Sequence, residues 1–173
     1  MRALALLSLT LWLSACATAP AGNGSTASSS SNTATATQTQ SFIAAMEAKR
    51  GSALTLAERL QVQGLTGTAK VGLNNTQNNF LNKIGAQVGL DGAVIAALFP
   101  EAGKPLSETA VVAKIESRLG KKLAAADQAA VKTATALRNN SLVSLKTGLA
   151  ASIGSRIGLS TEVVLALMPM LGL

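Results

Sequence analysis

Residues 84–103, IGAQVGLDGAVIAALFPEAG, return at residues 153–172 as IGSRIGLSTEVVLALMPMLG. A shift of 69 residues aligns the two copies without a gap, and they share the glycine and proline positions 85/154, 89/158, 100/169 and 103/172. Glycine and proline punctuate structure rather than fill it, so this agreement favours a duplication over chance similarity between alanine-rich helices. The same shift aligns residues 42–104 with residues 111–173, more weakly in their first halves. We therefore expect two tandem, sequence-related units.

Apolar residues recur in both units at spacings of three and four, which is the period of an α-helix. The helix-capping residues, glycines and prolines predict four short helices in each unit. In the first unit we expect Ser41 and Gly51 to bound the first helix, Thr55 and Glu58 to open the second as a capping box, Gly89 to end the third, and Asp91 to begin a fourth that ends before Pro100. The second unit repeats this pattern with Ser107, Gly120, Gly158, Ser160 and Pro169.

The expected fold is all-α: a compact helical domain at residues 41–173, built from two four-helix units. The fourth helices, VIAALF and VVLALM, are apolar nearly all round, so each is buried or meets a partner or lipid. We expect the two to pack against each other at the centre. The apolar C-terminus at residues 163–173 is too short to span a bilayer, which leaves core packing, a partner groove or membrane insertion.

The third and fourth helices resemble a DNA-binding helix-turn-helix in their spacing of apolar residues and glycine. Base reading needs side chains such as Arg, Asn, Gln or Ser on the recognition helix. The matching positions are mostly alanine or acidic, as at Asp91 and Glu162. We therefore expect no nucleic-acid binding. The pairs Gly85/Gly89 and Gly154/Gly158 have the spacing that permits close helix contact, and we interpret them as packing inside the domain.

Composition restricts the chemistry. The chain has no histidine, no tyrosine and one cysteine, Cys16. This pattern excludes His/Cys metal sites and nucleophile–histidine pairs, and we expect no metal or other cofactor. No two acids lie in a motif that would bring them together. We therefore expect no enzymatic activity. An enzyme remains the third hypothesis, to be tested at the repeat-matched acids Glu47 and Glu116.

The N-terminus carries Arg2, then an apolar run from Ala3 to Leu13, then Leu13-Ser14-Ala15-Cys16. The run is shorter than the roughly 20 residues of a membrane-spanning helix and has the form of a signal peptide. The tetrapeptide resembles the lipobox of bacterial lipoprotein precursors. The resemblance implies cleavage after residue 15 and a diacylglycerol, often with palmitate, on Cys16. Leu13, Ser14 and Ala15 would then be the residues read by the processing machinery.

Residues 17–40, ATAPAGNGSTASSSSNTATATQTQ, contain no charge and no large apolar residue. Such composition favours a disordered tether, and we expect a flexible linker over residues 16–40. In the Gram-negative family pattern, Asp after the cysteine retains a lipoprotein in the inner membrane. Residue 17 is Ala, so the resemblance implies the outer membrane, facing the periplasm.

These patterns predict a lipid-anchored protein of the bacterial cell envelope that acts by binding or by structure. Its expected partners are the membrane, through the lipid on Cys16, and an envelope protein or an apolar ligand. The alternative is a carrier of apolar ligands or lipids enclosed between the two repeats. Without Arg2 the chain has 14 basic and 8 acidic residues, which are scattered rather than clustered and indicate a solvated basic surface.

Overall fold

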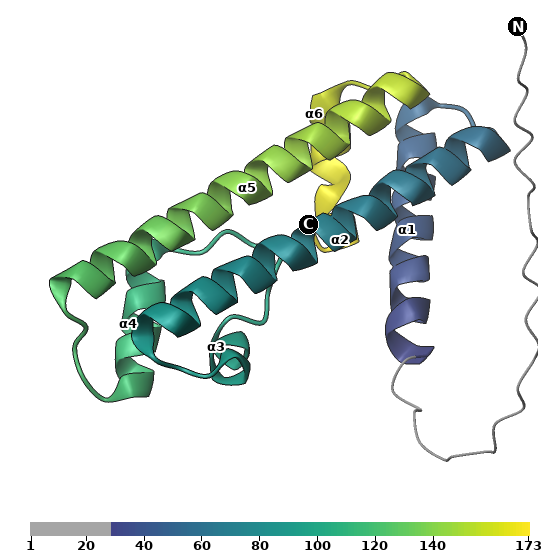
Figure 1. The fold of residues 1–173 in the computed structure, drawn as a ribbon. Coiled ribbons are helices and arrows are strands. Elements are labelled where there is room, and N and C mark those ends of the chain that lie inside the picture. Colours follow the sequence, from purple (N-terminus) through teal and green to yellow (C-terminus); the bar gives the residue numbers. More distant parts are fainter. Residues whose placement is uncertain (1–28) are drawn as a thin grey trace, which may run out of the picture.

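The computed structural model describes residues 29–173, and in this range the chain is helical and forms no β-strand (Figure 1). The all-α prediction is confirmed. The elements are α1 (Ser29–Arg50), α2 (Leu56–Val88), α3 (Gly92–Leu98), α4 (Glu108–Leu119), α5 (Ala125–Ile157), α6 (Thr161–Leu167) and the short 3₁₀ helix η1 (Met168–Leu171).

The helix boundaries follow the sequence repeat. α2 and α3 begin and end 69 residues before α5 and α6, and α1 ends 69 residues before α4. Each unit has three helices, however, so the prediction of four was wrong. The expected second and third helices form one helix of 33 residues, α2 or α5. No proline interrupts either segment, and internal glycines such as Gly64 and Gly67 cost a helix only about 1 kcal/mol each.

α1 begins earlier than the sequence suggested. It starts at Ser29 rather than at Ser41, so residues 29–40 of the predicted linker are helical. The chain between residues 25 and 50 contains neither glycine nor proline. Once the apolar end of α1 has formed the first turns, each further turn adds hydrogen bonds without a new nucleation cost. Contacts with α2 support the extension: Thr39 is buried, and Lys70 Nζ donates to Gln38 Oε1 at 3.3 Å.

α2 and α5 lie side by side and antiparallel, and they form the long axis of the molecule (Figure 1). They approach closely at Gly72, where an added Cβ would lie 2.8 Å from Leu145 Cδ1. A 33-residue helix is about 50 Å long, which is more than one small core can cover. The pair therefore carries one hydrophobic cluster at each end.

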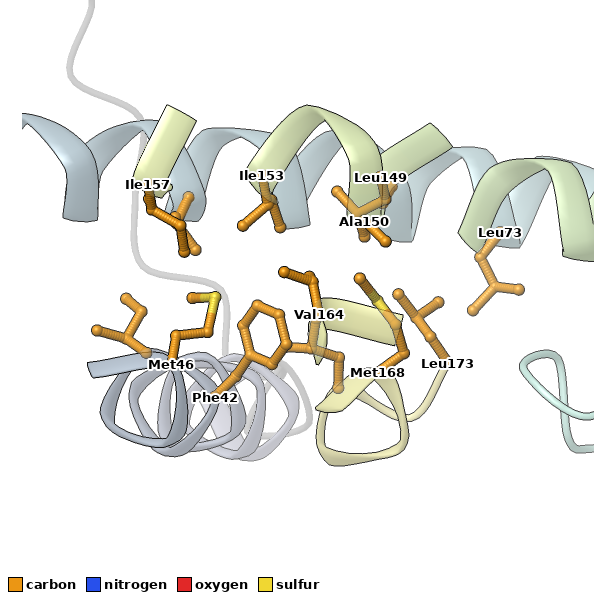
Figure 2. Packing of buried hydrophobic residues seen from close by; sticks show 14 of the residues in the cluster. Phe42, Met46, Leu73, Leu149, Ala150, Ile153, Ile157, Val164, Met168 and Leu173 are labelled. Carbon is orange, nitrogen blue, oxygen red and sulfur yellow. The ribbon is translucent and has the colours of Figure 1, made fainter. Parts of the chain in front are cut away.

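Each cluster draws on both repeats. The first, the α1–α6 cluster, joins α1 and the first half of α2 to the second half of α5, α6 and η1, with Phe42, Met46, Ile153, Ile157, Val164 and Met168 at its centre (Figure 2). The second, the α3–α4 cluster, joins the second half of α2 and α3 to α4 and the first half of α5, with Phe80, Ile84, Ile95, Phe99, Val111 and Ile115. The two units are thus interlocked, and neither has a core of its own.

This exchange overturns one expectation. α3 and α6 were predicted to pack together at the centre, but Ile95 of α3 and Val164 of α6 are fully buried in different clusters. The two short helices lie at opposite ends of the α2–α5 pair (Figure 1). Each closes one cluster against the long helices through its buried residue, Ile95 or Val164.

The predicted caps are confirmed apart from Ser41. Thr55 and Glu58 form both bonds of a capping box, and Asp91, Ser107 and Ser160 accept hydrogen bonds from the first turns of α3, α4 and α6. The glycines that follow α1, α2, α4 and α5 have the left-handed backbone conformation that only glycine adopts without strain: Gly51, Gly89, Gly120 and Gly158.

No single helix of the described range is long and apolar enough to cross a membrane. By length and composition alone, the pair of Ala125–Ile157 with Thr161–Leu171 passes that test when taken together, although it is bent by 119°.

Candidate functional site

Cys16, which is predicted to carry the lipid, lies outside the described residues, and so do Leu13, Ser14 and Ala15, which are predicted to be recognised during processing. The signal peptide and the linker as far as residue 28 lie outside them too. The chain enters the described range at the N-terminus of α1. Twelve residues separate Cys16 from Ser29. Even a fully extended chain of that length spans at most about 43 Å.

Glu47 and Glu116, the acids at equivalent positions of the two repeats, each bind the connection, or corner, between two successive helices. Glu47 Oε1 accepts a hydrogen bond from the backbone N–H of Leu54 at 2.9 Å, and Glu116 Oε1 accepts one from that of Leu123 at 3.1 Å. Arg59 and Gln128 occupy equivalent positions in the two repeats. In each unit this side chain donates hydrogen bonds to the glutamate and to the carbonyl of the leucine. Each acid therefore ties the end of one helix to the start of the next.

The two acids belong to corners at opposite ends of the α2–α5 pair, so they are not a catalytic pair (Figure 1). The ammonium of Lys122, which donates to Glu116 at 2.7 Å, and the N–H of Leu123 hold the pKa of Glu116 below its usual range. Residues 29–173 contain no cluster of three or more acidic, cysteine or histidine side chains that would suit a metal ion.

The first glycine of each pair, Gly85 or Gly154, packs against the turn that follows its own helix, and the second, Gly89 or Gly158, has the left-handed conformation that ends the helix. The N–H groups of Gly89 and Leu90 both donate to the carbonyl of Gly85. A Cβ at Gly85 would lie 2.9 Å from Leu90 O, and one at Gly154 would lie 2.6 Å from Leu159 O. The resemblance to a helix-turn-helix therefore has a structural origin: both repeats need a tight turn between a long helix and a short one.

A buried arginine, which the sequence reasoning missed, holds the segment between the repeats. Arg138 is 3% exposed and donates through Nε to Gln77 Oε1 at 2.8 Å. Its other nitrogens donate to three carbonyls of that segment, at Glu101, Ala102 and Lys104. Burial lowers the pKa of Arg138.

Three neighbouring side chains make further hydrogen bonds to the backbone around this segment. We refer to these contacts, together with those of Arg138, as the clasp. Gln77 donates to Phe99 O at 2.7 Å, Asn139 exchanges two hydrogen bonds with the backbone of Leu106, and Lys146 donates to Gly103 O at 3.0 Å. The sequence gives an indication of the clasp. Arg138 is equivalent to Ala69 and Lys146 to Gln77, so the two repeats differ at these positions. Only one segment joins the two units, so its clasp has no repeated counterpart.

A hollow of about 160 Å³ lies on the surface between α2 and α5, lined by Thr76, Asn79, Phe80, Lys83, Ala134, Leu137, Arg138 and Ser141. The guanidinium of Arg138, one of its lining residues, lies 5.3 Å from the centre of the Phe80 ring. All the polar groups of that guanidinium are directed to the clasp. α3 and α6, between which the carrier alternative expected its ligand pocket, lie in separate clusters.

Two cations of α4, Lys114 and Arg118, lie beside α3. Two adjoining hollows of about 440 and 480 Å³ are lined by Ala93, Val94, Ala97 and Leu98 of α3 and by Lys114, Ser117 and Arg118 of α4. We refer to these seven residues as the α3–α4 surface.

No protein-family model, no curated protein and no solved structure matches this chain.

Proposed function

We propose that this chain is a lipid-anchored protein of the bacterial cell envelope with a non-enzymatic binding or structural role. The observation that carries the proposal is the run Leu13-Ser14-Ala15-Cys16 at the end of a short apolar stretch, because it combines the processing site and the acceptor cysteine of lipoprotein precursors. One acyl chain holds a protein to a bilayer only marginally, whereas two or three anchor it stably.

The position of the helical domain along the chain supports this proposal. With Cys16 in a bilayer, the N-terminus of α1 lies within about 43 Å of the membrane surface, since only twelve residues intervene. The interlocked helices then form a scaffold held close to the membrane at one end of α1.

The contacts of the acids support a role without catalysis. Glu47 and Glu116, the acids that the repeat singles out, bind backbone N–H groups at helix corners. Glu58 caps α2 and pairs with Arg50 at 2.8 Å. These carboxylates are used to fix helix ends rather than to face a common cleft.

Metabolic labelling tests the anchor. Cells expressing the full chain are grown with radiolabelled palmitate, alongside Cys16→Ala and the control Thr18→Ser, which leaves the lipobox intact. We expect label in the wild type and the control and none in Cys16→Ala. Equal labelling of all three chains, or of none, contradicts the proposal.

Fractionation tests the membrane that we propose. In a Gram-negative host the wild type is expected with the outer membrane, because Ala17 lacks the carboxylate of the retention pattern. Ala17→Asp should move the labelled protein to the inner membrane on a sucrose gradient, and Ala17→Ser should not. Identical gradients for wild type and Ala17→Asp would count against the outer membrane.

A further inference from the structure

The α3–α4 surface combines exposed small apolar residues with cations. Ala93 and Ala97 are exposed and Val94 and Leu98 are half-buried, so the outer face of α3 offers a shallow apolar strip. Lys114 and Arg118 rise beside this strip from successive turns of α4, and Lys121 and Lys122 follow just beyond the end of α4. The surface is therefore amphipathic: apolar on one helix and basic on the next.

Most of these cations lack an acidic partner. Lys114 Nζ donates to Leu98 O at 3.3 Å and lies 5.6 Å from the centre of the Phe99 ring, which holds its ammonium at the edge of the strip. The ion pairs found within residues 29–173 involve neither Arg118 nor Lys121. Lys122 is paired with Glu116.

The matched corner of the other repeat has two of its cations in ion pairs. There Arg50 pairs with Glu58 at 2.8 Å and Arg59 with Glu47 at 2.6 Å. Lys114, Lys121 and Lys122 match Ala45, Ser52 and Ala53, so a single cation, Lys49, corresponds to the group of four. The basic surface is thus a property of one end of the molecule and not of the repeat.

The N-terminus of α1 lies on the same side of the α2–α5 pair as α3 and α4 in Figure 1. Figure 1 shows α3 and α4 below the α2–α5 pair, on the side toward which the N-terminal half of α1 projects. The corner between α1 and α2 lies above the pair in this view, and α6 packs against α1 at the end of the pair away from α3 and α4. With at most about 43 Å of chain between Cys16 and α1, this side of the domain is within reach of a membrane that holds Cys16.

We propose that the α3–α4 surface docks onto anionic lipid headgroups of the membrane that holds the chain. This inference rests on the proposed anchor for its geometry and on charge complementarity for its partner. Basic residues near an anionic bilayer are attracted within about one Debye length, and the apolar strip of α3 can settle at the level of the headgroups. The anchor keeps the domain at the membrane, and the surface sets which face is turned toward it.

A pair of matched fluorescent reporters tests this orientation. The full lipidated chain is purified as Ala97→Cys or as Ala166→Cys, which are exposed and equivalent positions of α3 and α6. Each thiol receives an environment-sensitive dye, and the chain is reconstituted into phosphatidylcholine vesicles with or without phosphatidylglycerol, containing nitroxide-labelled lipid as quencher. We expect strong quenching at residue 97 in the anionic vesicles, weak quenching there in neutral vesicles, and little at residue 166 in either.

Charge variants supply the second measurement. In the Ala97→Cys chain, Arg118→Gln with Lys121→Gln should reduce quenching in anionic vesicles severalfold, because each cation near such a surface contributes a factor of roughly five in binding. The control, Lys49→Gln with Arg156→Gln, removes the same charge from exposed positions at the other end and should change little. Circular dichroism confirms that both variants remain helical.

The outcomes separate the two proposals. A chain that incorporates palmitate but shows equal quenching at residues 97 and 166 keeps its anchor and overturns the docking surface. A chain without palmitate whose residue 97 is still quenched in anionic vesicles alone supports the surface and contradicts the anchor. A dye at residue 97 that responds to an added envelope protein and to no vesicle would also overturn the lipid proposal.

Discussion

Glu47 and Glu116 make the same contact at opposite ends of the molecule: each accepts a hydrogen bond from the backbone N–H of a leucine seven residues later, at 2.9 and 3.1 Å. Both leucines, Leu54 and Leu123, are buried, one in each hydrophobic cluster. The carboxylates therefore fix the corners that seat these leucines. The duplication preserves a structural bond, and this determines what their replacement should do.

Replacing Glu116 by Gln should remove part of the acid sensitivity of folding. The bonds from Lys122 and from the N–H of Leu123 lower the pKa of Glu116 in the folded state. A carboxyl with a lowered folded pKa stabilises the protein above its unfolded pKa of about 4.3, and this contribution is lost as the pH falls through the folded value. We therefore expect Glu116→Gln to be less stable than the wild type at pH 7 and nearly equal to it below both pKa values.

Urea unfolding at neutral and acidic pH measures this difference. Glu108→Gln, at an exposed position in the first turn of α4, is the control and should show a smaller change. A stability gap between wild type and Glu116→Gln that is the same at both pH values would show that the charge of Glu116 is not what stabilises the corner.

Capping residues and glycines made the connections between helices predictable. The capping box of Thr55 with Glu58 and the left-handed Gly89 and Gly158 depend on a few adjacent residues, so the sequence reveals them directly. The polar start of α1 was misjudged because its order depends on packing against α2, which composition does not show. The sequence also did not predict which helices pack against each other, because periodicity identifies an apolar face but not the helix that covers it.

Arg138→Met should destabilise the fold strongly. The methionine keeps most of the packing volume but leaves the carbonyls of Glu101, Ala102 and Lys104 without their donor. A buried polar group left unsatisfied costs about 1–3 kcal/mol, so the loss of several should reduce the free energy of unfolding by about 3 kcal/mol or more.

Lys132→Met on the same helix is the matched control, with an expected change within about 0.5 kcal/mol. Limited proteolysis gives a second readout, since the segment between the repeats should become cleavable in Arg138→Met first. A variant as stable as the control, with that segment still protected, would mean that the clasp contributes nothing to joining the repeats.

The interlocked clusters predict that neither repeat folds alone. A fragment of residues 29–104 retains α1, α2 and α3, yet it lacks α5, which covers α2 in both clusters. A fragment of residues 105–173 has the complementary defect. We expect each fragment to show weak helical circular dichroism and no cooperative thermal transition, and their equimolar mixture to recover both.

A mixture of residues 29–104 with a second fragment that carries Ile153→Asp is the control, because Ile153 is fully buried in the α1–α6 cluster. An unpaired charge there should prevent recovery. A cooperative transition in either fragment on its own would contradict the interlocked arrangement.

Two glycines of α5 should respond to alanine in opposite directions. At Gly154 an added Cβ would lie 2.6 Å from Leu159 O in the backbone of the corner, so the turn must shift to admit it. Forcing extra volume into such a contact typically costs about 1–3 kcal/mol. At Gly148, six residues earlier on the same helix, nothing lies within 4 Å of the added Cβ. Replacing an unconstrained helical glycine by alanine stabilises by roughly 0.5–1 kcal/mol.

Chemical denaturation should therefore show a lower unfolding midpoint for Gly154→Ala and a higher one for Gly148→Ala. Two shifts of the same sign would show that close approach of the backbone is not the reason for glycine at position 154.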